Sequence, residues 1–299
     1  VNATITTNNG DINLVADDND GTADGTGTLN IAAQVSSGGG NVNLVGANFN
    51  ITADVDAGSG DIAVATSQTG NDLDFDGAGE LETDAETDRL LTTGSLTFGQ
   101  VTGIAGFTDV TQDNIVFGRA TDLTALAPAS IAFVANTGIN IDADVTTSTA
   151  TTLNADADAD GGTLTLNTND ELVTGDNPIV VFADAFTLPA GGILDAGTSG
   201  ITINDSTGAG IGLGAATVGL DLTTSEVGSN FTGTGGITFV TAGNIGADDF
   251  TSTGKGLVTL DAAGDISFNN NDSLFHSLLA EADGNITAVL AAISTQTGP

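Results

Sequence analysis

The chain contains no cysteine, methionine, tryptophan or tyrosine, and it has a single histidine, His276. Without cysteine, neither a disulfide framework nor a thiolate metal site can form. One histidine also excludes a histidine cluster as a metal centre. Aromatic side chains are confined to 13 phenylalanines, so the aromatic platforms expected at a polysaccharide-cleaving site are scarce.

Basic residues are equally rare. Arg89, Arg119 and Lys255 stand against 39 acidic residues, which gives a formal net charge of -36. Nucleic acids and anionic lipids bind through Lys and Arg, so neither is an expected partner, and cations are the natural companions of this surface. The most apolar stretch near an end, Ile286 to Ile293, is far shorter than the roughly 20 residues of a membrane-spanning helix. We therefore expect no membrane insertion. A strongly acidic surface also suits salty or calcium-containing water outside the cell, so we expect an extracellular or cell-surface location.

What the chain does contain is glycine, with 42 residues, and a 39% share of hydrophobic residues. That apolar share is too high for a disordered acidic chain. The phrase GNVNLV at Gly40 returns as GDIAVA at Gly60, and its apolar residues alternate as in a strand with one buried face. The spacing predicts that Val42 lies beside Ile62 in neighbouring layers, and that Leu29 lies beside Phe49.

The same phrase recurs near the other end, in ITFVTAGNIG, VTLDAAGDIS and LLAEADGNIT. It predicts that Val258 lies beside Leu278. The glycines of these phrases are Gly243, Gly264 and Gly284, each followed by Asn or Asp and then Ile. This pattern is typical of a corner between two strands, where we expect glycine to adopt a positive φ angle and Asn or Asp to bond the turning backbone.

A fixed period with alternating strands and Gly/Asx corners predicts an all-β fold: a right-handed parallel β-helix, or β-solenoid, with about 20 residues per coil. We expect one such unit over residues 1–299. The pattern loosens near 17–27 and 75–94, and both segments are predicted to be projecting loops or insertions.

Two acidic runs resemble the opening of a calcium-binding loop, because alternate carboxylates followed by Gly can wrap a calcium ion. The bidentate Glu at the twelfth position is missing from both runs: Thr83 and Asn167 stand there. The alternative is a strand with one solvated acidic face. Calcium is therefore the only cofactor candidate, and its six candidate ligands are Asp72, Asp74, Asp76, Asp156, Asp158 and Asp160.

The segment from Gly208 to Ala247 resembles the repeat regions of large exoproteins of the filamentous haemagglutinin type. The similarity is carried by IGLG at Ile211, by GLDLTTSE from Gly219 to Glu226, and by GGITFVTAGNI from Gly235 to Ile245. The resemblance implies a secreted β-helix that forms a stalk or fibre and serves adhesion or surface structure.

Composition and resemblance together predict a non-enzymatic structural or adhesive segment of a cell-surface fibre. Its expected partners are further copies of itself, end to end along a fibre axis, and surface glycans or a host or neighbouring cell. Two alternatives remain: a polysaccharide lyase or hydrolase, since such enzymes also use β-helices, and a calcium-dependent surface binding module.

Overall fold

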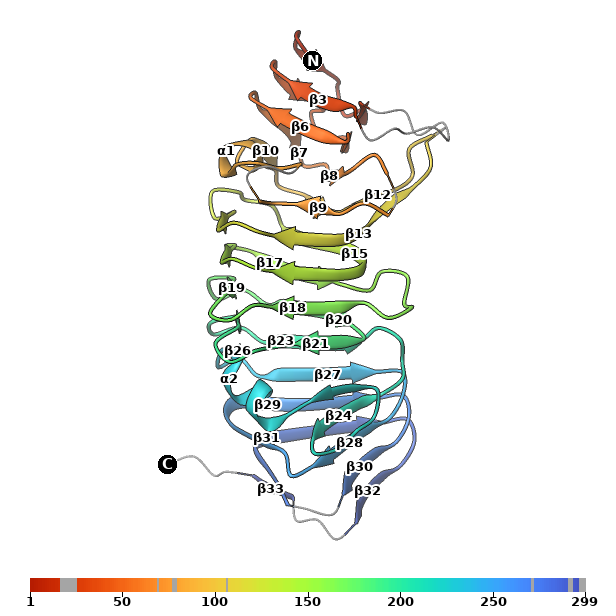
Figure 1. The fold of residues 1–299 in the computed structure, drawn as a ribbon, viewed down its shortest axis with the longest axis vertical. Coiled ribbons are helices and arrows are strands. Elements are labelled where there is room, and N and C mark those ends of the chain that lie inside the picture. The colour runs from red at the N-terminus through yellow and green to blue at the C-terminus, as the bar shows by residue number, and fades with distance from the viewer. Residues whose placement is uncertain are drawn as a thin grey trace.

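The computed structural model describes residues 1–16, 26–68, 70–76, 80–105, 107–269, 272–289 and 293–295. Within these ranges the chain forms 33 strands and two short helices, so the fold is all-β. Parallel strands are stacked in layers along one long axis, and the N-terminal and C-terminal strands lie at opposite ends of the stack (Figure 1).

The largest sheet contains 17 strands. They are β2 (Ile12–Val15), β5 (Val42–Val45), β8 (Ile62–Ala65), β9 (Leu73–Asp74), β11 (Ser95–Phe98), β12 (Gln100–Val101), β13 (Val110–Phe117), β15 (Ser130–Ile141), β17 (Ala150–Asn154), β18 (Thr163–Leu166), β20 (Ile179–Ala183), β21 (Ala185–Thr187), β23 (Ile201–Asp205), β27 (Ile237–Thr241), β29 (Thr251–Ala262), β31 (Ser273–Ala282) and β33 (Ile293–Thr295).

Four smaller sheets hold the remaining strands. The first contains β1 (Ile5–Thr6), β4 (Val35–Ser36), β7 (Val55–Gly58) and β10 (Leu90–Thr92); the second β14 (Thr121–Asp122), β16 (Val145–Thr146), β19 (Glu171–Val173), β22 (Ile193–Asp195) and β26 (Phe231–Thr232); the third β24 (Ile211–Gly214), β25 (Leu220–Leu222), β28 (Ile245–Asp248), β30 (Ile266–Asn269) and β32 (Ile286–Val289); the fourth β3 (Thr28–Ile31) and β6 (Asn48–Ile51). The helices are α1 (Asp84–Thr87) and α2 (Thr224–Ser229).

The register confirms the predicted neighbours. Val42 pairs with Ile62, Leu29 with Phe49, and Val258 with Leu278, all in parallel. The interval between paired residues is not uniform, however. It is 20 residues at each of these three steps, but it is 36 residues where Ile201 pairs with Ile237 and 42 residues where Leu73 pairs with Ile115. Loops of different length are therefore extruded between layers whose strands stay in register.

The inward side chains form one continuous apolar cluster along the stack. One part of it is built from phenylalanines: the rings of Phe75 and Phe117 stack with centroids 4.8 Å apart, and those of Phe98 and Phe133 stack at 5.5 Å. All four side chains have no solvent exposure. Ring pairs of this kind stabilise a core beyond the area that they bury, by about 0.5–1.5 kcal/mol each.

The φ angles of the corner glycines differ from the positive values predicted from the sequence. Gly243, Gly264 and Gly284 do not have φ angles in the left-handed region. Glycine is needed there because the backbones of successive layers approach closely: a Cβ atom on Gly264 would lie 2.6 Å from the carbonyl oxygen of Gly243, and one on Gly284 would lie 2.9 Å from that of Gly264. A side chain cannot enter this space, and the glycines form a column.

The Asn or Asp that follows Gly243 and Gly264 accepts a hydrogen bond from the next layer and not from its own turn. Asn244 Oδ1 accepts a hydrogen bond from the backbone N–H of Asp265 at 2.8 Å, and Asp265 Oδ1 accepts one from the N–H of Asn285 at 2.6 Å. An equivalent ladder joins Asp11 to Asn41, Asn41 to Asp61, and Asp61 to Ser95. Each repeated Gly-Asx pair therefore ties one layer to the next.

Of the two predicted insertions, 17–27 lies outside the described residues except for its last two positions. In 75–94, Phe75 and Leu81 are buried in the core, and β10 pairs in parallel with β7, so much of the described segment belongs to the stack. A hairpin that the repeat analysis did not predict extends from β12 to the start of β13, and this pairing is the one antiparallel pairing among the described strands.

Candidate functional site

The first acidic run lies on β9 and the residues beside it. Leu73 and Phe75 are fully buried, while Asp72 and Asp76 are exposed and Asp74 is half-buried. This is the alternation of a strand with one apolar face and one solvated acidic face. Asp72 Oδ1 accepts a hydrogen bond from Asn114 Nδ2 on the next layer at 2.8 Å.

The carboxylates of this run lie close enough to oppose one another's ionisation. Burial, together with the negative charges of Glu80, Asp72 and Asp76, raises the pKa of Asp74 to about 6. Burial also raises the pKa of Glu80, whose Oε2 accepts a hydrogen bond from the backbone N–H of Asp74 at 3.0 Å. The acidic run on β9 therefore concentrates negative charge, and protonation of Asp74 reduces the repulsion between its carboxylates.

The second acidic run is a turn, which corrects the expectation of a strand with alternating faces. Ala159 has a φ angle of 60°, and Asp158 and Asp160 are exposed. Carboxylate oxygens of Asp156, Asp158 and Asp160 lie within 4.8 Å of one another, and no other group in the described residues meets that spacing for a metal ion.

The carboxylate of Asp156, however, already accepts hydrogen bonds from the backbone. It is 3% exposed, and its Oδ1 accepts hydrogen bonds from the N–H groups of Asp160 at 3.0 Å and Gly161 at 3.2 Å. Its Oδ2 accepts one from the hydroxyl of Ser206. Burial alone would raise the pKa of Asp156, but the hydrogen bonds from Ser206 and the turn backbone lower it. The geometry is that of a carboxylate that holds a turn.

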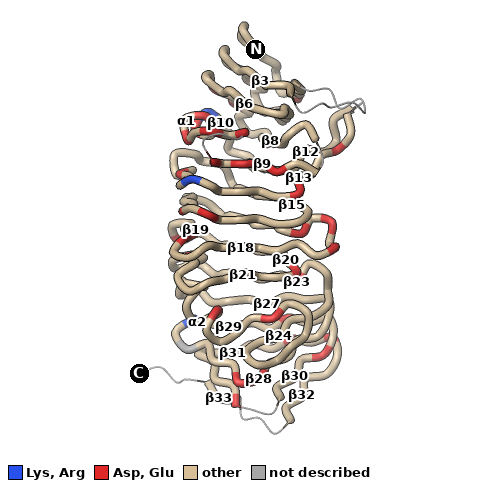
Figure 2. Tube along the Cα trace, in the orientation of Figure 1, with Lys and Arg blue, Asp and Glu red and all other residues tan. Residues whose placement is uncertain are grey.

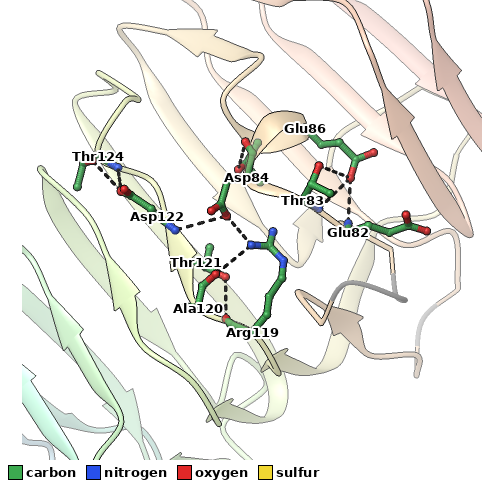
Figure 3. A network of polar contacts seen from close by, with 10 residues as sticks. Glu82, Thr83, Asp84, Glu86, Arg119, Ala120, Thr121, Asp122 and Thr124 are labelled. Carbon is green, nitrogen blue, oxygen red and sulfur yellow. Dashed lines mark hydrogen bonds and ion pairs between the residues drawn. The ribbon is translucent and has the colours of Figure 1, made fainter.

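Two of the three basic residues gather around α1 (Figures 2 and 3). Arg119 Nη1 donates to Asp84 Oδ1 at 2.5 Å and to the carbonyl oxygen of Ala120 at 3.1 Å. Its Nε and Nη2 are buried and have no hydrogen-bond partner in the described part of the chain. Arg119 thereby fastens the first turn of α1 to the layer that contains β14.

The start of α1 is fixed by its own acidic residues. Glu86 Oε2 accepts hydrogen bonds from the N–H groups of Glu82 at 2.9 Å and Thr83 at 3.1 Å, the capping-box arrangement (Figure 3). Beside the helix an open cavity of about 270 Å³ is lined by residues that include Glu82, Glu86 and Arg89. Arg89 pairs with Asp54 at 3.1 Å, but both side chains are well exposed, so this ion pair contributes little stability.

The third basic residue, Lys255, is 9% exposed, and sequence analysis did not predict its burial. Its Nζ donates to the carbonyl oxygen of Phe231 on β26, the last strand of the second small sheet. Burial lowers the pKa of Lys255. The ammonium group thus covers a strand edge from β29, while His276 on β31 is half-buried.

Asp205, at the end of β23, is a buried carboxylate that was not among the residues predicted from the sequence. It is 7% exposed, and it accepts hydrogen bonds from the N–H groups of Thr207, Gly208 and Gly210 and from the hydroxyl of Thr241. The DSTGAG phrase could have indicated it, because Asp before Ser/Thr and Gly commonly caps a turn. Its role is structural.

No family model, curated protein or solved structure matches the chain. The resemblance to exoproteins of the filamentous haemagglutinin type therefore stays a prediction that rests on the motifs in the sequence. Among the described residues, no helix has the length and apolar character needed to cross a membrane.

Proposed function

We propose that the chain is a right-handed parallel β-helix whose shortest coils hold about 20 residues. The observation that carries this proposal is the parallel register at 20-residue intervals, seen where Val42 pairs with Ile62 and Val258 with Leu278. Parallel strands joined by crossover connections are right-handed in roughly 98% of cases, because of the twist of the strands. The longer intervals are coils with extruded loops.

Its function is non-enzymatic: it is a structural and adhesive segment of an extracellular, cell-surface fibre. Ladders of backbone hydrogen bonds that follow the long axis, with a dry apolar core inside, suit a rod that transmits tension and spans distance. The net charge of -36 keeps such rods soluble and apart from polyanions. The resemblance to filamentous haemagglutinin-type exoproteins supports the same assignment.

The partner for the fibre is more of the same fold, stacked along the axis. In the last described layer, Ile286 and Val289 on β32 are each 53% exposed and Ile293 on β33 is 43% exposed. A further parallel layer would cover these side chains and pair with the open edges of both strands. Such a layer is supplied by a covalent continuation or by a second copy.

Negative-stain imaging and size-exclusion chromatography test the assembly. We expect rods whose lengths are multiples of one stack, and we expect Ile286→Lys to shorten them, because a charge at an open edge opposes strand addition. Thr259→Lys, on the outward face of β29, is the matched control and leaves the lengths unchanged. A dispersed monomer at all concentrations, with Ile286→Lys behaving as the unsubstituted chain does, would contradict assembly from subunits.

The non-enzymatic assignment has its own test. We expect no release of reducing sugar or unsaturated product from neutral or acidic polysaccharides above a protein-free blank. Turnover that one carboxylate substitution abolishes, with the fold intact by circular dichroism, would favour the lyase or hydrolase alternative instead.

A further inference from the structure

A polar groove lies on the outward face of the large sheet, where β13, β15 and β18 run side by side. Its open volume is about 260 Å³. The polar residues and the glycine that line it are Asn114, Thr137, Gly138, Asn140, Thr163 and Thr165. No repeated motif marks these positions, and only the register of the three strands brings them together.

The groove exists because one layer lacks a side chain. Asn114 pairs with Gly138, and Gly138 pairs with Thr163, so the glycine stands between two longer residues in one outward column. Layers are about 4.8 Å apart, which leaves a gap of roughly 10 Å between the outer two. A Cβ atom at position 138 would fill the floor, 2.8 Å from the carbonyl oxygen of Thr163 and 3.3 Å from Asn114 Oδ1.

Two carboxylates fix the orientation of the amides in this groove. Asn114 Nδ2 donates to Asp72 Oδ1 at 2.8 Å, which leaves Asn114 Oδ1 on the side of Gly138. Asn140 Nδ2 donates to Asp142 Oδ2, also at 2.8 Å. A carboxylate oxygen can only accept, so the amide nitrogens must face the aspartates and the amide oxygens must face away.

Asn140 Oδ1 is then an acceptor without a donor: it is buried and has no hydrogen-bond partner within the described residues. Leaving a buried acceptor unpaired destabilises the fold. Asn140 lines the groove, and a hydroxyl or ammonium donor of a ligand there removes this cost once the groups that cover the buried oxygen shift. The hydroxyls of Thr163 and Thr165, on the same wall, can donate or accept as the ligand requires.

The charge around the groove selects against anions. Neither Arg nor Lys lines it, and the carboxylates of Asp72 and Asp142 are hydrogen-bonded to its two amides. The volume is below the 300–1,000 Å³ of sites that enclose a drug-sized molecule, so it suits one small ring lying on the surface. The ligand must therefore be small, rich in donors and not negatively charged.

We propose that this groove binds one residue of a neutral or amino polysaccharide. A sugar ring presents several hydroxyl donors around a compact body, and an open groove on a flat sheet lets the rest of a polymer leave in both directions. Because no aromatic ring lines the site to stack on the sugar, we expect millimolar affinity for a short oligomer. The inference names a ligand for the adhesive part of the proposed function, on which it rests.

Isothermal titration and saturation-transfer NMR on the full chain test it. The probes are the tetramers of glucosamine, N-acetylglucosamine, mannose and galacturonic acid. We expect at least one of the first three to bind, the acidic tetramer not to bind, and Thr165→Lys or Asn140→Leu to weaken binding at least 10-fold. Thr238→Lys, an equally half-buried outward threonine on β27, is the control that keeps binding.

The proposal would be overturned if none of the three non-acidic tetramers binds at a sugar concentration 20-fold above the expected millimolar Kd. Preference for the galacturonic acid tetramer, or unchanged binding in both groove variants, would also overturn it. If Thr165→Lys does not fold, as judged by circular dichroism, Thr165→Gln replaces it. Fibre length is measured separately by imaging. Absence of sugar binding by the unsubstituted chain, with intact rods, refutes the groove alone, and absence of rods formed by the unsubstituted chain refutes the fibre.

Discussion

Gly60→Ala tests the idea that glycine is required at the corners for close approach and not for its φ angle. A Cβ atom on Gly60 would lie 2.1 Å from the carbonyl oxygen of Gly40 and 2.4 Å from its carbonyl carbon. Side-chain carbons essentially never approach other heavy atoms within 3.0 Å. Both clashing atoms belong to backbone, so the neighbouring layer must move as a whole.

The cost follows from what that movement breaks. Overpacking of a tight site costs about 1–3 kcal/mol. Displacing the corner also weakens the hydrogen bonds from Asp61 N–H to Asn41 Oδ1 at 3.0 Å and from Ser95 N–H to Asp61 Oδ1 at 2.7 Å, at about 1 kcal/mol each. We expect Gly60→Ala to lower the free energy of unfolding by about 3–5 kcal/mol.

Gly228→Ala is the matched control. Gly228 lies in α2, its φ angle is outside the left-handed region, and a Cβ atom there meets no heavy atom within 4 Å. Alanine in an exposed helix stabilises it by about 0.5–1 kcal/mol relative to glycine. Urea unfolding followed by circular dichroism measures both variants. Equal midpoints for Gly60→Ala and the unsubstituted chain would refute the close-approach argument.

Three further predictions concern the carboxylates. Asp205→Ala leaves four hydrogen-bond donors unpaired and should lower the free energy of unfolding by about 2–4 kcal/mol; the exposed Asp261→Ala on β29 should change it by less than about 0.5 kcal/mol. The pKa of Asp74, about 6 in the fold against 3.8 as its ordinary value, means that the folded chain binds more protons between these pH values, so stability falls as pH rises through this window. Asp74→Asn should therefore stabilise the chain by up to about 1 kcal/mol near pH 7, after allowance for solvent screening, and have no effect near pH 3. Because Asp156 already bonds the turn, calcium should raise the melting temperature no more than sodium chloride of equal ionic strength does.

Each of these predictions has an outcome that contradicts it. Equal stability of Asp205→Ala and Asp261→Ala would mean that the four donors find other partners. A gain for Asp74→Asn that persists near pH 3 would assign the effect to packing instead of charge. A calcium-specific rise in melting temperature that Asp158→Asn abolishes would establish a calcium site in the second acidic run.

Much of the fold follows from local pattern. The alternation in GNVNLV and GDIAVA is sufficient to place Val42 beside Ile62, because a residue in a strand points to one face or the other and equal spacing keeps the same face inward. The same rule places Leu73 and Phe75 inside and their acidic neighbours outside. Composition is likewise sufficient to predict an all-β protein with an acidic surface.

The contacts between layers were decided by the tertiary structure. The run from Asp156 to Asp160 has the same alternation as the run on β9, yet it forms a turn, because Asp156 is bonded by Ser206, 50 residues away. Glycine is required at position 264 because the backbone of Gly243, in the layer before, approaches it closely. The φ angle of Gly264 does not indicate this requirement.

The charged residues and the groove depended on the same information. The burial of Lys255 against Phe231 and the pairing of Arg119 with Asp84 join segments 24 and 35 residues apart in sequence. The groove at Gly138 requires three strands in register across loops of unequal length. Side-chain direction within a strand is a local property that the sequence determines, whereas the partner in the next layer depends on how much chain each loop takes up, and only the folded stack sets that length.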